Sequence, residues 1–174
     1  MASAYREANF TDFVTYLPAV GDKAPARYEE IYEENRHRVF ALAFYMTDSE
    51  VAGEEVLEST FRRAFAMNEA PTAEQIDRAL IASLREYVPL GVLTLNIREV
   101  PSKADIRGNV KRIHLEQAVV ELPHTERLVF LMHDVERYEH SKIARLLGFT
   151  EDESQFAVHQ ARLRMRELLS KQQR

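Results

Sequence analysis

The chain of 174 residues contains no cysteine. It therefore has no disulfide, no thiolate metal ligand and no cysteine nucleophile. Glycine and proline are scarce, at five and six residues, which favours helices because barrels and sandwiches need frequent turn residues. Hydrophobic residues make up 45% of the chain and charged residues 29%, as in ordinary soluble globular proteins. We expect an all-α fold.

Long apolar runs are also absent. Nothing approaches the roughly 20 apolar residues of a membrane span, and the first 22 residues lack the apolar run of a signal peptide. A cytoplasmic protein without membrane insertion is expected. The net charge of −5 argues against indiscriminate nucleic-acid binding, but it is unevenly spread. Residues 25–88 hold seven Arg/Lys and thirteen Asp/Glu, giving −6, whereas residues 112–174 hold ten of each, giving zero.

Apolar spacing predicts three helices in the first half of the chain. Steps of three, four and seven residues indicate an amphipathic helix over 26–46. Asp48 is expected to cap a second helix, and Thr72 with Gln75 forms a capping box that opens a third. The third helix is expected to run to Val88. We assign residues 1–24 to an N-terminal extension and 25–88 to a three-helix domain.

The second half of the chain shows a different organisation. Residues 89–112 are predicted to be a linker, part of which packs on a neighbouring domain; within it, 92–97 has the composition of a short strand but no evident partner. Residues 113–174 form a second domain with helices over 114–122, 124–134, 140–147 and 151–170. Gly148 is expected to end the third and Thr150 to cap the fourth. A short helix, a glycine turn and a longer helix is the helix-turn-helix pattern, which also occurs in bundles that bind no DNA.

Three passages carry a family resemblance: residues 32–43 (YEENRHRVFALA), residues 51–65 (VAGEEVLESTFRRAF), and residues 115–169 with Leu122-Pro123 and the run from His159. In their order and rough spacing they resemble extracytoplasmic-function sigma factors, the two-domain minimal members of the sigma-70 family. The resemblance implies a bacterial transcription initiation factor. Its partners would be core RNA polymerase, promoter DNA and an anti-sigma factor, and it would act by binding, with no catalysis and no cofactor.

The second passage resembles the family helix that grips the polymerase clamp. In the family an acidic residue and a glutamine three positions later face polymerase, and here those positions carry Glu55 and Glu58. Glu50, Glu54 and Glu58 line one face, where like charges repel by roughly 0.2–0.5 kcal/mol per pair. Without the family resemblance, the residues favour the interpretation that this stripe is an acidic helix face exposed to solvent. The resemblance implies polymerase binding by Glu54, Glu55 and Glu58.

The resemblance also places −35 promoter recognition on the helix that starts near Thr150. The implied DNA-binding residues are Lys142, Gln155, His159, Gln160, Arg162 and Arg166. Two departures from the family pattern stand out. The family usually has lysine, serine and arginine where this chain has Gln155, Phe156 and Ala157, and the third helix, which melts promoters in the family, carries only Arg78 and Arg85 as cations.

A helical wheel divides the last helix into two faces. Val158, Ala161, Met165 and Leu169 form the stripe expected to be buried. Phe156 and Leu163 lie on roughly the opposite face, together with Asp152, His159 and Gln160. This outer face is partly apolar and suits a protein surface, so Phe156 and Leu163 are candidate contacts for an anti-sigma factor.

Two alternative functions remain open. A sigma-factor mimic would keep the fold and bind an anti-sigma factor without reading DNA, although known mimics carry an attached phosphoryl-receiver domain. A plain helix-turn-helix regulator would leave the N-terminal block unexplained. No metal site is expected from the six histidines at 37, 114, 124, 133, 140 and 159, because none forms a His-Glu-x-x-His pair and His133 and His140 do not share a helical turn.

Overall fold

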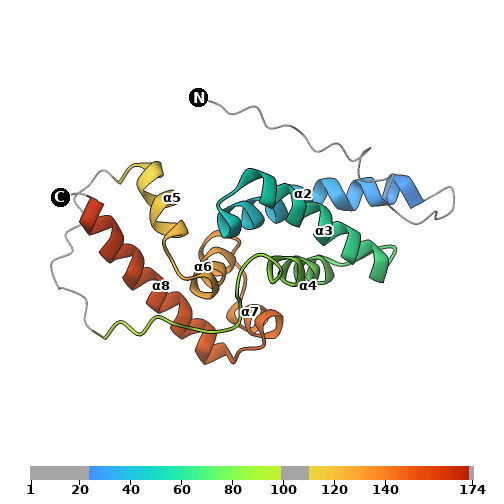
Figure 1. Cartoon of the computed structure of the whole chain (residues 1–174). Helices are drawn as coiled ribbons and strands as arrows, with labels where there is room; N and C mark the ends of the chain where they lie inside the picture. Colours follow the sequence, from blue (N-terminus) through green and yellow to red (C-terminus); the bar gives the residue numbers. More distant parts are fainter. Residues whose placement is uncertain (1–23, 99–109, 173–174) are drawn as a thin grey trace. The chain divides into compact units, whose positions relative to one another are not determined.

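The computed structural model describes residues 24–98 and 110–172, and in these ranges the chain forms helices and no β-strand (Figure 1). The prediction of an all-α fold is confirmed. The elements are α2 (Ala24–Thr47), α3 (Glu50–Met67), α4 (Ala73–Leu84), α5 (Arg112–Val120), α6 (His124–Phe130), the π-helical turn η1 (Leu131–Val135), α7 (His140–Leu147) and α8 (Glu151–Gln172).

The described residues divide into two compact units. The first consists of the described residues up to Phe44 together with Ser49–Leu84, and the second of Tyr45–Asp48 together with the described residues from Arg85 onward. The predicted linker 89–112 thus begins inside the second unit, and its residues 99–109 lie outside the described residues, as does most of the predicted extension 1–24.

Aromatic pairs join α2 to α3 in the core of the first unit. The rings of Tyr28 and Phe65 lie 4.5 Å apart between centroids, and those of Tyr32 and Phe61 lie 4.8 Å apart. All four side chains are buried, and tilted pairs at this separation are favourable beyond their area burial. Burial raises the pKa of the Tyr32 hydroxyl above its usual value.

The start of α3 differs from the prediction that Asp48 caps it. Asp48 adopts a left-handed backbone conformation, with φ at +52°. Ser49 instead has the extended conformation of an N-cap, and its Oγ accepts a hydrogen bond from the amide of Ala52 at 3.3 Å. The predicted cap was therefore wrong by one residue, because the turn bends at Asp48 and leaves Ser49 to face the first helical turn.

The capping box that opens α4 is confirmed. The amide of Thr72 donates to Gln75 Oε1 at 2.8 Å, and the amide of Gln75 donates to Thr72 Oγ1 at 3.3 Å. The helix ends at Leu84, four residues earlier than predicted. Val88 lies beyond the end of the helix and is nevertheless buried. The prediction that its side chain faces inward is therefore confirmed, although the helix does not reach it.

In the second unit, α6 and α7 pack against α8, and α5 packs against α8 as well. The largest fully buried side chains of this unit include Leu122, Leu128, Met132 and Ile143. The helix predicted over 124–134 is two elements: α6 and then η1, where the amide of Glu136 donates to the carbonyl of Leu131. Single π-helical turns of this kind are frequent at functional sites.

In the described part of the chain, no helix has both the length and the apolarity needed to cross a membrane.

Candidate nucleic-acid interface

The helix-turn-helix is formed by α7, the turn Gly148–Thr150 and α8. Gly148 takes φ +79°, which side-chain-bearing residues rarely adopt, and the amides of Gly148 and Phe149 both donate to the carbonyl of Ala144 at 2.9 Å. The predicted bounds 140–147 of the first helix and the predicted start of the second at residue 151 are confirmed, whereas α8 runs to Gln172, two residues further than predicted. The glycine therefore lets the chain turn sharply from α7 into α8.

Thr150 caps α8, as predicted, and Glu153 completes a reciprocal box that the sequence analysis missed. The amide of Glu153 donates to Thr150 Oγ1 at 3.1 Å, and the amide of Thr150 donates to Glu153 Oε2 at 2.7 Å. The hydrogen bonds from Thr150 lower the pKa of the Glu153 carboxyl. The signal was present in the sequence as Thr-x-x-Glu before an apolar run.

Four of the predicted DNA-binding side chains are exposed on α8: Gln155, His159, Arg162 and Arg166. The Nε and Nη2 of Arg162 donate to the two carboxylate oxygens of Asp134 in η1, at 2.9 and 2.6 Å. Lys142 lies on α7 with its Nζ 3.4 Å from the centroid of the Tyr138 ring, a cation–π contact.

Gln160 does not lie on the exposed face where the helical wheel put it. Its side chain is 3% exposed, and its Oε1 accepts a hydrogen bond from the amide of Ile97. Its Nε2 donates to the carbonyl of Ile97 at 3.4 Å. The wheel failed for this residue because a segment distant in sequence covers that part of α8.

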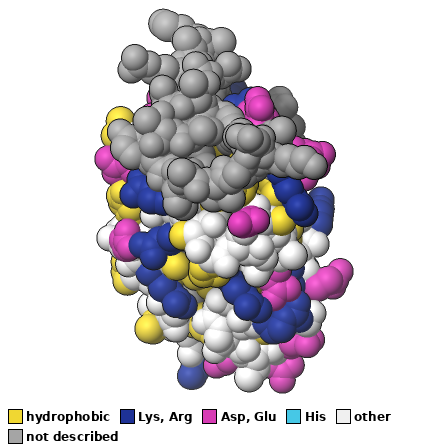
Figure 2. Space-filling model, turned by 90° about the vertical axis from the view of Figure 1, so that its right-hand side faces the viewer, with side chains coloured by type: hydrophobic (Ala, Val, Ile, Leu, Met, Phe, Trp, Pro, Cys, Tyr) yellow, Lys and Arg dark blue, Asp and Glu magenta, His cyan; other side chains and the backbone are white. Residues whose placement is uncertain are grey.

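The other wheel assignments agree with the structure. Val158, Ala161, Met165 and Leu169 are all buried, and Phe156 is 43% exposed. Leu163 is half-buried, and Asp152 is exposed beside Glu151 at the start of the helix. On the part of the face in Figure 2 that is not grey, Lys and Arg side chains are interspersed with Asp and Glu side chains.

His133 of η1 and His140 of α7 stack on each other, with ring centroids 4.1 Å apart. His133 Nδ1 contacts the carbonyl of Tyr138 at 2.9 Å, and His140 Nδ1 contacts Ser154 Oγ at 3.0 Å. Sequence spacing gave no sign of this pair, because the π-helical turn and the following loop bring the rings together. Among the described residues, no group of three or more histidine, aspartate or glutamate side chains is placed to hold a metal ion.

The surroundings of His140 disfavour its protonation. Burial lowers the pKa of its imidazole most, and the nearby His133 and Arg162 lower it further, while Glu139 and Glu151 oppose them. The folded state therefore favours the neutral imidazole over the charged one.

We expect acid to destabilise the second unit through His140. A histidine whose folded pKa lies below its unfolded value keeps the folded state fully stable only above the unfolded pKa, near 6.5. As the pH falls below that value, the unfolded chain takes up the proton first and the free energy of unfolding drops. Urea unfolding at pH 7.5 and 5.5 measures this drop. His140→Asn, which retains a polar group near Ser154, should show a smaller drop than the native chain, and an equal drop would contradict the assignment.

The acidic residues predicted to contact polymerase lie on α3 in the first unit. Glu55 is exposed, and Glu54 and Glu58 are partly exposed. Glu58 accepts a hydrogen bond from Arg62 one turn later, an exposed pair that stabilises the helix only slightly. Val56, Leu57 and Phe61 on the other side of the helix are buried, so the carboxylates remain on its outer side.

The second unit is thus a helix-turn-helix domain in which α8 presents polar side chains from its first turns. Residues 112–165, which run from α5 into α8, match the family model described as sigma-70, region 4. A search among curated proteins finds no match. This domain is therefore similar to sigma-70 region 4, and the match does not extend to the first unit.

Proposed function

We propose that the chain is an RNA polymerase sigma factor of the extracytoplasmic-function type, which directs core polymerase to promoters in the bacterial cytoplasm. The observation that carries the proposal is the match of residues 112–165 to sigma-70 region 4 on a domain that has helix-turn-helix geometry. The family resemblance of residues 32–43 and 51–65, within the predicted domain 25–88, supports the same function. The factor acts by binding, with no reaction of its own.

In this proposal α8 meets the −35 element. Recognition helices present their N-terminal residues to base edges in the major groove, where glutamine pairs with adenine and arginine with guanine. Gln155 and His159 are exposed polar side chains in the first turns of the helix, after the acidic residues Glu151–Glu153, and Arg166 lies further along it. Arg162 is held by Asp134, so it reaches a phosphate only by leaving that carboxylate.

The first unit would dock on core polymerase through Glu54, Glu55 and Glu58. Exposed carboxylates of one sign attract a basic partner surface and raise the association rate. Glu58 forms an exposed ion pair with Arg62, and a stronger basic partner can replace that interaction at little cost.

The proposed docking is tested by measuring the affinity of the purified chain for core RNA polymerase. We expect Glu55→Lys/Glu58→Lys to weaken binding by about tenfold or more, since it reverses two charges at the contact. The matched control is Glu29→Lys/Glu30→Lys, which makes the same charge change at exposed positions of α2. Equal losses for the two variants would show that only net charge matters, and no binding by the native chain would reject the docking.

The alternative function is a sigma-factor mimic that binds an anti-sigma factor without reading DNA. The half-exposed Phe156 in the first turns of α8 favours it, as do the three acidic residues Glu151–Glu153 at the end where base contacts are made. In that case Phe156 and Leu163 would contact the anti-sigma factor. Binding to core polymerase distinguishes the two functions, because a mimic needs no polymerase.

A further inference from the structure

An extended segment of the chain, Gly91–Arg98, is bound to the outside of the helix-turn-helix domain. Its side chains alternate in exposure. Leu93, Leu95 and Ile97 are half-buried, whereas the residues before, between and after them are exposed, with Val92 at 71%. The segment belongs to no helix or strand in the described residues. In Figure 1 it follows α4 and runs past α6 and α8.

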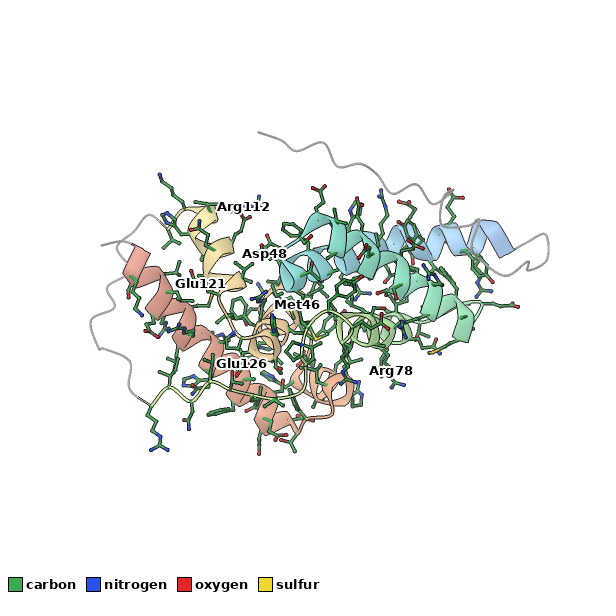
Figure 3. All side chains as sticks on the ribbon, viewed as in Figure 1. Met46, Asp48, Arg78, Arg112, Glu121 and Glu126 are labelled. Carbon is green, nitrogen blue, oxygen red and sulfur yellow. The ribbon has the colours of Figure 1, made fainter. Side chains whose placement is uncertain are left out.

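Glu126 of α6 holds the middle of this segment. Its side chain is 1% exposed, and its Oε1 accepts hydrogen bonds from the amides of both Thr94 and Leu95, the latter at 2.7 Å. The Thr94 hydroxyl adds a third bond at 3.3 Å. Figure 3 labels Glu126 where the extended segment passes. All donors described for this buried carboxylate come from the segment and reach Oε1, so the segment replaces part of the water that the carboxylate loses on burial.

Gln160 of α8 holds the end of the segment. Its side-chain amide makes both a donor and an acceptor contact with the backbone of Ile97, so it pairs with that residue as a neighbouring strand would. The beginning is held by Thr125, whose Oγ1 accepts a hydrogen bond from the amide of Gly91 at 3.2 Å. The three anchors come from two helices and are themselves buried.

All but one of these contacts are made to the backbone of the segment. A surface that contacted the segment by chance would bury apolar side chains without placing a carboxylate and an amide opposite successive backbone groups. Here the polar anchors match an extended backbone, and the apolar side chains fill alternate positions. Strand addition to a sheet edge likewise combines main-chain hydrogen bonds with pockets for alternate side chains, but here helix side chains provide the hydrogen-bond partners.

We propose that Thr125, Glu126 and Gln160 form a docking site for an extended peptide, and that Gly91–Arg98 is its built-in occupant. The segment acts as a latch: it opens without unfolding the domain, and its opening uncovers Gln160 on the recognition helix and the carboxylate of Glu126 on α6. The latch couples the predicted linker to the surface of α8. The latch requires neither DNA nor polymerase. Its experimental test therefore does not depend on the proposed function.

Amide hydrogen exchange of the native full chain, followed by NMR, tests the latch directly. We expect the amides of Leu95 and Ile97 to exchange at least about tenfold more slowly than that of Asn96, for which no bond is described. They should also exchange at least about tenfold faster than core amides such as that of Leu128, because the latch opens locally. Exchange as fast as at Asn96 would show that the segment is not docked, and exchange as slow as in the core would show a fixed part of the domain.

Proline substitutions test the docking site. Leu95→Pro/Ile97→Pro removes both amide donors from the middle and end of the segment, while Val92→Pro/Asn96→Pro places two prolines at exposed positions with no described bonds. We expect the first variant alone to shift the side-chain amide resonances of Gln160 while it retains the helical circular dichroism of the native chain. Equal shifts in both variants would contradict specific backbone docking.

A synthetic peptide of residues 90–98, titrated to millimolar concentration, should then return the Gln160 resonances of the Leu95→Pro/Ile97→Pro variant toward their native positions. Millimolar peptide is the appropriate range because a short tether supplies a comparable effective concentration. The native chain, whose site is occupied, should respond at least about tenfold less. No response from the proline variant would overturn the docking site.

Discussion

Replacing Arg127 with methionine is expected to lower the free energy of unfolding of the second unit by about 2–5 kcal/mol. The guanidinium is 6% exposed and holds the end of α5: its Nε and Nη2 donate to the carbonyl of Leu122 at 3.2 and 3.0 Å, and Nη2 also donates to that of Val120. Burial lowers the pKa of Arg127 from its usual value, in keeping with these surroundings. Methionine fills most of the volume but leaves both carbonyls without this donor, at about 1–3 kcal/mol for each.

The Arg127 effect is measured by urea unfolding, with hydrogen exchange on peptides from α5–α8 to assign it to the second unit. Arg127→Lys should recover only part of the loss, because one ammonium group cannot reproduce the planar fork of the guanidinium. Arg166→Met is the matched control: that arginine is exposed on α8, and the change should stay within about 0.5 kcal/mol. A loss at Arg127 no larger than at Arg166 would contradict the structural role.

Arg38→Met is expected to destabilise the first unit by about 3–5 kcal/mol. Arg38 of α2 forms an ion pair with Asp77 of α4, whose side chain is fully buried at 0% exposure. Its Nη2 also donates to Asn35 Oδ1 at 2.8 Å, which fixes the guanidinium in place. Removing the arginine leaves a buried carboxylate without its counter-charge, and the cost of that uncompensated charge exceeds the Coulomb energy of an exposed pair.

The double variant Arg38→Met/Asp77→Leu separates charge from packing. Replacing both members of a buried pair with apolar side chains is often neutral or stabilising, so it should recover most of the loss. Hydrogen exchange on peptides from α2–α4 reports the stability of this unit separately. A double variant as unstable as Arg38→Met would show that the loss arises from packing and not from the ion pair.

Local signals in the sequence sufficed for most of the helices and their ends. The capping box of Thr72 with Gln75, the left-handed Gly148 and the cap at Thr150 all depend on residues within four positions of one another, so spacing alone predicts them. The Ser49 cap was missed because Asp48 is an equally good capping residue in isolation. Only the bend of the turn decides between them.

Features built from distant residues gave no local signal. The His133–His140 stack depends on the π-helical turn, and the burial of Gln160 depends on Ile97, 63 residues earlier in the chain. Glu126 reads as an ordinary helical glutamate in sequence, and its burial follows from the docked segment Gly91–Arg98. The sequence therefore predicted that the candidate site lies on α8. It did not predict which side chains of α8 remain exposed. The predicted contacts with polymerase, DNA and an anti-sigma factor stay predictions.

The most direct test of the proposed function is run-off transcription from genomic DNA fragments by purified core RNA polymerase with this chain added. We expect that the chain binds core polymerase and that discrete transcripts appear only in its presence. Gln155→Ala/His159→Ala should reduce those transcripts without weakening the binding to core. Binding without any transcript, or no binding at all, would contradict the proposal that this chain directs polymerase to promoters.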